Sequence, residues 1–278
     1  MMRKSKMLVA AIVLGLSLGS CNSVFAAADN VVKTNPNNGS AADASATGLA
    51  TTAVGNGANA QGNYTIAIGN LAQSTGVQSM AIGVNALASG GDSIMIGYIA
   101  PGAVGQGATG GTSIAIGNST TASGLGTTAV GFLAKATGST ATALGWSSVA
   151  TGETATAVGG GAMAFGKLSS ALGYAAMSTA ENATATGTQA AAGGVNSSAF
   201  GENSAALGDN STALGQASQA TAKNATATGQ GAMASGISST ANGQGANASG
   251  LQSTALGAGS AASGQNATAT GYNAKATA

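Results

Sequence analysis

The chain has 278 residues and a formal net charge of +1, and 46 of its residues are glycine. Charged residues make up 5% and aromatic residues 3%, whereas a charged share of about 25% is usual for globular domains. Histidine is absent and cysteine occurs once. We therefore expect no helix bundle, no metal site of His and Cys ligands, no cofactor and no enzyme.

Residues 1–26 have the features of a secretory signal peptide. Three basic residues among the first six precede an apolar run from Met7 to Leu18, which is too short to cross a bilayer as a helix. A small-x-small cleavage pattern ends at Ala26. Cleavage there leaves five basic against seven acidic residues. The net charge then becomes about −2, and we expect no nucleic-acid binding.

Two interpretations of Cys21 remain open. Its Leu-Gly-Ser-Cys context resembles a bacterial lipobox, whose cysteine is lipidated and becomes the mature N-terminus. The alternative is an incidental cysteine within an ordinary signal peptide. Residues 27–45 lack the regular spacing that follows, and we expect them to form a flexible leader.

A seven-residue repeat fills residues 46–278. Glycine occupies 30 of the 33 repeat positions, and alanine lies two residues before 30 of them. The exceptions to glycine are Ala180, Ala222 and Ala278. Within each unit the small residues alternate with others at period two, which indicates a strand, and glycine supplies the turn. Strands of about five residues joined by about two leave no room for a crossover helix, so the chain is predicted to coil as a parallel β-solenoid.

The polarity of the side chains one and three residues before each glycine follows a period of 14 residues. One coil therefore contains two strands. In the first half-coil, which ends at Gly55, Gly69 and their equivalents, these side chains are large and apolar. In the second half-coil, which ends at Gly62, Gly76 and their equivalents, they are mostly polar or small. Small residues line the interior, and about sixteen coils at about 4.8 Å each predict a rod about 80 Å long.

The apolar side chains of the first half-coils form a ladder that a monomer does not normally expose. Burial of each contributes about 1.5–3 kcal/mol, so the ladder as a whole is worth at most about 20–40 kcal/mol per chain. We therefore expect self-association through it. The apolar ladder consists of Val54, Ile66, Ile68, Met80, Ile82, Ile94, Ile96, Ile114, Ile116, Val130, Leu144, Val158 and Leu172.

One insertion of six residues interrupts the spacing near residues 98–109. It contains Pro101, and we expect it to bulge from the rod as a loop, either as a specificity element or as a harmless insertion. Toward the C-terminus threonine replaces many ladder residues, and we expect that third of the rod to be less stable.

Ser79-Met80-Ala81-Ile82-Gly83 and Ser113-Ile114-Ala115-Ile116-Gly117 resemble the head repeats of trimeric autotransporter adhesins, the YadA-like or haemagglutinin-type repeats. The resemblance covers residues 46–278. It implies an all-β, left-handed parallel β-roll, three chains around one axis, and export to a bacterial surface or outer membrane. It also implies adhesion to host cells or to matrix proteins such as collagen, fibronectin or laminin, and no small-molecule substrate. The family pattern continues into a stalk and a membrane anchor. Since the sequence ends in a repeat at Ala278, we expect a partial product, a secreted protein, or attachment through a lipidated Cys21.

Aromatic residues follow the glycine of several first half-coils and should lie on turns along one edge of the rod. Such a row suits binding of a protein or glycan, but it could equally cover seams between neighbouring chains. These candidate ligand-binding residues are Tyr98, Phe132, Trp146 and Tyr174.

The predicted function is an adhesin head that displays a repetitive surface. The alternative is a structural spacer or surface-layer rod that binds nothing specific. A third reading is ice or lattice binding, based on Thr-x-Thr pairs such as Thr184 with Thr186, which recur only at every third coil.

Overall fold

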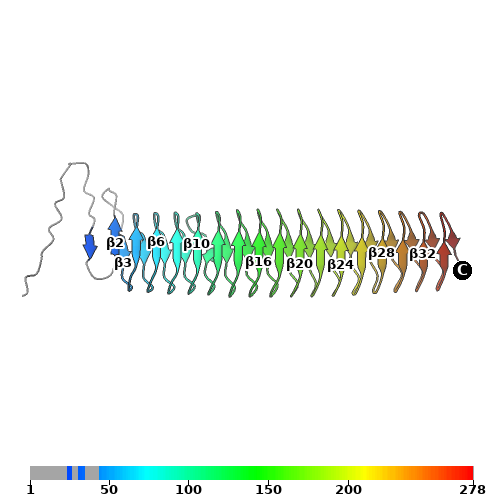
Figure 1. Cartoon of the computed structure of the whole chain (residues 1–278), viewed down its shortest axis with the longest axis horizontal. Coiled ribbons are helices and arrows are strands. Elements are labelled where there is room, and N and C mark those ends of the chain that lie inside the picture. Colours follow the sequence, from blue (N-terminus) through cyan, green and yellow to red (C-terminus); the bar gives the residue numbers. More distant parts are fainter. Residues whose placement is uncertain (1–23, 27–30, 35–43, 278) are drawn as a thin grey trace, which may run out of the picture.

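A computed structural model describes residues 24–26, 31–34 and 44–277, and the signal segment up to residue 23, with Cys21, lies outside these residues. Figure 1 shows the repeat region as a straight stack of coils in chain order. The regular elements of the described residues are all β-strands, 35 in number, in two sheets. In that part of the chain, no helix is long and apolar enough to cross a membrane.

Sheet I has 18 strands: β1, β2 and one three-residue strand from each first half-coil. They are β1 (Val24–Ala26), β2 (Val31–Thr34), β4 (Thr52–Val54), β6 (Ile66–Ile68), β8 (Met80–Ile82), β10 (Ile94–Ile96), β12 (Ile114–Ile116), β14 (Thr128–Val130), β16 (Thr142–Leu144), β18 (Thr156–Val158), β20 (Ser170–Leu172), β22 (Thr184–Thr186), β24 (Ser198–Phe200), β26 (Thr212–Leu214), β28 (Thr226–Thr228), β30 (Thr240–Asn242), β32 (Thr254–Leu256) and β34 (Thr268–Thr270).

Sheet II contains one two-residue strand from each second half-coil. They are β3 (Ser45–Ala46), β5 (Asn59–Ala60), β7 (Gln73–Ser74), β9 (Leu87–Ala88), β11 (Gly107–Ala108), β13 (Thr121–Ala122), β15 (Lys135–Ala136), β17 (Val149–Ala150), β19 (Met163–Ala164), β21 (Met177–Ser178), β23 (Ala191–Ala192), β25 (Ala205–Ala206), β27 (Gln219–Ala220), β29 (Met233–Ala234), β31 (Asn247–Ala248), β33 (Ala261–Ala262) and β35 (Lys275–Ala276).

Neighbouring strands of the repeat region lie one coil apart and pair in parallel. Ile66 pairs with Met80 in sheet I, and Asn59 pairs with Gln73 in sheet II. Both pairs are 14 residues apart, which confirms the two-stranded parallel coil. The strands are shorter than the five residues expected, although backbone hydrogen bonds between coils continue into the turns, as from Gly69 N to Val54 O at 2.8 Å.

The interior is a column of small side chains from both sheets. Ala67 of sheet I and Ala60 of sheet II have no exposed surface, and neither have Thr65 and Ala72, which lie four residues before their glycines. Side chains this small let the two sheets approach closely and pack without voids. The expected division into small inward and larger outward positions is confirmed.

The two turns of each coil differ in backbone conformation. Glycines that follow the sheet I strands of the repeats have φ between 118° and 147°, a region that side chains with a Cβ rarely adopt. Glycines that follow sheet II strands, such as Gly152, have no such φ. Ala180 and Ala222, two exceptions to the glycine pattern, both lie at sheet II turns. A Cβ at Gly152 would also meet the backbone of Gly166 in the next coil, so both turns favour glycine, and the turn after sheet I adds the requirement for this φ.

Within residues 27–45, which we expect to form a flexible leader, the structure describes residues 31–34, 44 and 45. Strand β2 pairs in parallel with β4 and in antiparallel with β1, so it extends sheet I beyond the first coil. Ser45 begins β3. The repeat period fails to indicate β2 because that strand lies outside the glycine spacing.

The insertion leaves sheet I continuous. Ile94 of β10 pairs with Ile114 of β12, a step of 20 residues instead of 14. The additional residues form a loop between β10 and β11, as expected. In sheet II, β11 pairs with β9 only through Ala108 and Ala88. The same coil contains Met95, the largest fully buried side chain of the described residues.

Candidate functional site

The apolar ladder lies on the outer face of sheet I, and all thirteen of its side chains are there. Parallel register aligns them in two columns, one of which runs without interruption from Val54 to Leu172. Ile68, Ile96 and Leu172 are 37–38% exposed, and most other members are half-buried by their neighbours. The single chain therefore presents a continuous apolar strip.

The strip continues beyond the thirteen predicted residues. Phe200, Leu214 and Leu256 occupy the same column in later coils and are 38%, 49% and 36% exposed. Threonine or asparagine separates some of them, which obscures the pattern in the sequence. Their position one residue before the glycine is the signal that identifies them.

The outer face of sheet II is less polar than expected. Its central coils present Val149, Met163, Phe165, Met177 and Leu207, of which Phe165 and Leu207 are 41% and 50% exposed. The expectation of mostly polar or small residues holds at both ends of this face but is wrong in the middle. The same offsets from glycine could have identified these residues.

The candidate aromatic residues lie on one edge of the rod, at the turns that follow sheet I strands. Phe132 and Trp146 occupy consecutive coils and are 45% and 58% exposed. Tyr174, which is 61% exposed, follows two coils later, and Gly160 lies between. A Cβ at Gly160 would lie 3.5 Å from the Tyr174 ring, so this ring leans over the glycine. Tyr98 is 38% exposed and is separated from Phe132 by one coil.

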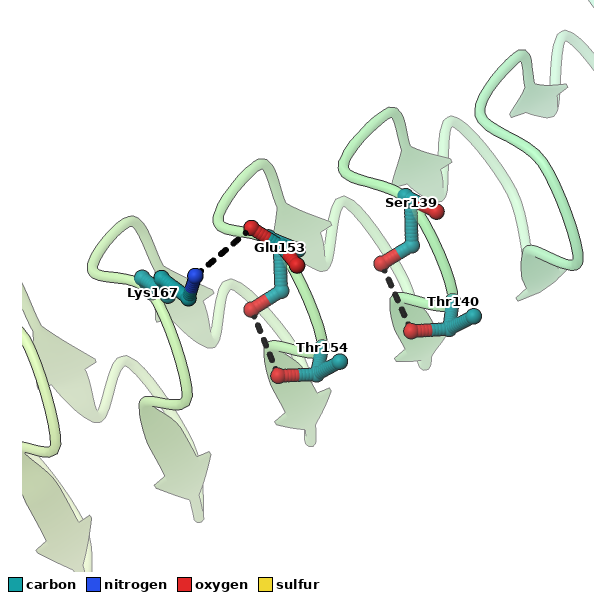
Figure 2. A network of polar contacts seen from close by, with 5 residues as sticks. All are labelled: Ser139, Thr140, Glu153, Thr154 and Lys167. Atoms are coloured by element: carbon teal, nitrogen blue, oxygen red, sulfur yellow. Dashed lines mark hydrogen bonds and ion pairs between the residues drawn. The ribbon is translucent and has the colours of Figure 1, made fainter.

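The opposite edge, at the turns that follow sheet II strands, is polar. Figure 2 shows Ser139, Glu153 and Lys167 on successive coils. Lys167 Nζ lies 3.0 Å from Glu153 Oε2, with both side chains more than half exposed. This hydrogen bond, together with the charges of Glu153 and Glu181, raises the pKa of Lys167.

Asparagine and glutamine ladders extend both edges toward the C-terminus. Asn182 Nδ2 donates to Asn196 Oδ1 at 3.0 Å on the polar edge, and Gln230 Nε2 donates to Gln216 Oε1 at 2.9 Å on the aromatic edge. Each bond joins residues 14 positions apart, so it ties one coil to the next. These ladders support the rod.

No group of three or more Cys, Asp or Glu side chains that could hold a metal occurs among the described residues. Serine and threonine hydroxyls donate mainly to nearby backbone carbonyls, as Ser113 Oγ does to Gly110 O at 2.7 Å. Among the described residues, no serine or threonine hydroxyl forms a hydrogen bond with a carboxylate, and general-base activation of a nucleophile requires a base. The outward faces and edges are the candidate functional surfaces.

Comparison with known proteins agrees with this geometry. The family model for the YadA head domain repeat matches residues 46–72, 74–98, 108–134, 136–162, 166–190, 192–216, 206–232, 234–260 and 262–278. The longest unmatched stretch within the repeats, residues 99–107, lies in the insertion loop. A search of curated proteins found no match.

Among solved structures, the crystal structure of the collagen-binding domain of the Yersinia adhesin YadA matches with 23% identity and a TM-score of 0.27. The match covers 66% of this chain and 68% of that chain. The repeated match of the family model, over most of the two-sheet rod, is the stronger finding. The chain therefore belongs to the family of YadA head domain repeats.

Proposed function

We propose that three copies of this chain associate through the apolar ladder of sheet I and form the head of a surface-exposed bacterial adhesin. The continuous apolar strip on sheet I is the observation that carries this proposal. The three-fold symmetry and the left-handed coil in this proposal are taken from the resemblance to trimeric adhesin heads. Export by the segment 1–26, with or without lipidation at Cys21, completes the proposal.

The structure reduces the hydrophobic free energy expected from trimer formation, relative to the value for fully exposed ladder side chains. Ladder residues such as Ile68 are already more than half covered in the single chain, so association buries only the remaining third or so of each. At about 1.5–3 kcal/mol for a fully buried side chain, thirteen residues then contribute at most about 6–13 kcal/mol per chain. Each of the three chains supplies this contribution to the trimer, which is sufficient for a stable oligomer.

We propose a binding role without catalysis, in which the head attaches to a matrix protein such as collagen, fibronectin or laminin. The aromatic edge supports this role, because Phe132, Trp146 and Tyr174 are exposed in the single chain beside the ladder. Tryptophan and tyrosine are enriched among residues that dominate binding energy. A rod that repeats one surface in three copies also favours multivalent attachment.

Binding of the purified chain to immobilised collagen, fibronectin and laminin tests the adhesin role. The Phe132→Ala and Trp146→Ala double variant should weaken binding at least tenfold. The control is Tyr272→Ala, which removes an 81% exposed tyrosine at the equivalent turn of a terminal coil. Absence of binding to all three proteins would favour the alternative of a structural spacer.

A further inference from the structure

The outer face of sheet II divides into large and small side chains over the six coils that span residues 149–223. Met163 and Met177 point outward from the second and third of these coils, and Met177 is 37% exposed. Ala191 and Ala205 take the same strand position in the fourth and fifth coils. A step in height therefore lies at the middle of this apolar region, which we call the sheet II patch.

A small apolar depression lies at this step. Met177, Ala191, Gly193 and Leu207 contribute to its lining, and its volume is about 80 Å³. Gly193 keeps it open, because a Cβ there would lie 3.2 Å from Leu207 Cδ2. The volume is far below the usual size of a small-molecule site. It suits the end of one flexible apolar side chain, such as the thioether of a methionine.

We propose that a second copy of this chain packs on the sheet II patch, with the two rods antiparallel and related by a two-fold axis level with the midpoint between the coils of Met177 and Ala191. In a two-fold contact each coil opposes the coil at the same distance on the other side of the axis. Met177 then faces the second copy's Ala191 and enters the depression beside Gly193. Met163 faces the second copy's Ala205, so a large side chain meets a small one at each position.

The same arrangement brings the polar edges of the two rods together. It places Lys167 beside the second copy's Asp209, and Glu153 beside the second copy's Lys223, and all four side chains are exposed. Asp209 Oδ1 accepts a hydrogen bond of 3.0 Å from Val195 N, which holds its carboxylate at this edge. A shift by one coil would oppose Glu153 to Asp209 or Lys167 to Lys223. Like charges in contact are unfavourable, so the charges select this register.

The contact is small. Lys135 precedes the patch and would face the second copy's Met233, which ends the apolar contact there. Six coils at about 4.8 Å span about 29 Å, and a strip one narrow sheet wide buries less area than a stable interface needs. We expect a dissociation constant on the order of 0.1 mM, so that pairs form only at high concentration. The sheet II patch faces away from the apolar ladder, so this pairing does not rest on the proposed trimer.

Sedimentation equilibrium of the purified chain, from about 10 µM to about 1 mM, tests the inference. The weight-average mass should at least double over this range. The doubling would start from three chains if sheet I assembles and from one chain if it does not, so the two proposals fail separately. A constant mass up to the highest concentration would leave the patch to a different partner and overturn the inference.

Charge variants test the register. Lys167→Glu places a carboxylate opposite Asp209, and Asp209→Lys places an ammonium group opposite Lys167, so each variant alone should associate at least tenfold more weakly. An equimolar mixture of the two opposes unlike charges at both positions and should regain association. Lys275→Glu and Asp92→Lys make the same changes at exposed residues far from the patch and should associate as the wild type does. A mixture that associates no better than its components would overturn the inference.

A methionine pair tests the apolar contact. Met177→Ser should weaken association about tenfold, because each pair of rods contains this contact twice. Met233→Ser is the matched control, since Met233 occupies the same strand position beyond the patch and is 39% exposed. Equal effects of the two substitutions would contradict the proposed contact.

Discussion

The glycine after each sheet I strand should be a sensitive position of the coil, because both its φ and the backbone of the next coil exclude a Cβ, and Gly187→Ala tests this. Gly187 has φ +132°, and a Cβ there would lie 2.5 Å from Gly201 O and 2.6 Å from Gly201 C of the next coil. The obstructing atoms belong to the backbone, so no side chain can rotate away. The two coils must separate, or the turn must change its conformation.

The free-energy cost of Gly187→Ala has two parts. An alanine held in a backbone region that favours glycine costs about 1–3 kcal/mol. Separation of the coils also weakens the hydrogen bonds from Gly201 N to Thr186 O and from Asn203 N to Thr188 O, both 2.9 Å. Each contributes about 1 kcal/mol net. We expect Gly187→Ala to lower the free energy of unfolding by about 3–5 kcal/mol.

Gly231→Ala is the matched control. Gly231 has φ +65° and nothing within 4 Å of an added Cβ, and alanine already stands at the equivalent positions 175 and 217. It should cost about 1 kcal/mol. Urea unfolding followed by circular dichroism, at one protein concentration, measures both variants. If Gly187→Ala lowered the free energy of unfolding by no more than Gly231→Ala does, the reasoning would be refuted.

Two further predictions concern polar side chains. Ser79 Oγ is buried and donates to Gly76 O at 2.7 Å, so Ser79→Ala should lower the free energy of unfolding by about 1–2 kcal/mol in urea. Ser169 Oγ is buried without a partner among the described residues, so Ser169→Ala should leave the free energy of unfolding unchanged or raise it. An equal loss of unfolding free energy in Ser79→Ala and Ser169→Ala would contradict this reasoning. The raised pKa of Lys167, caused by Glu153, makes its contribution complete below the ordinary lysine pKa of 10.5 and lost as pH rises through the raised value. Lys167→Met should therefore lower stability slightly at pH 7, where the exposed ion pair is intact, and should remove the loss that the wild type shows at alkaline pH, as urea midpoints measured from pH 7 to 11.5 would show.

Much of this fold follows from side-chain size at fixed offsets from glycine. Alanine at 53, 67 and 81 can lie only where the two sheets meet, and Ile66 and Ile68 must then point outward. Coil length, interior and outer faces were therefore predictable. Strand length was not, because it depends on which backbone groups around each turn remain in register with the next coil.

The difference between the two turns had a signal in the sequence. Ala180 and Ala222 interrupt the glycine pattern only after sheet II strands, where φ permits a Cβ. The conformation of the insertion had no such signal, because it depends on how residues 99–106 fold back. Gln106 stands where other coils have a fully buried alanine, serine or threonine, and only coordinates show that its amide oxygen lacks a partner.

Assembly through sheet I is the central claim, and sedimentation equilibrium tests it most directly. The wild-type chain should sediment at three times its monomer mass, which is at most 25.7 kDa. The Ile68→Asp and Ile82→Asp double variant should sediment as a monomer, because each carboxylate would be buried in the apolar strip. The control double variant, Gln219→Asp with Asn247→Asp on the exposed face of sheet II, should remain a trimer. A folded wild-type monomer, or a trimer that the ladder variant leaves intact, would contradict the account.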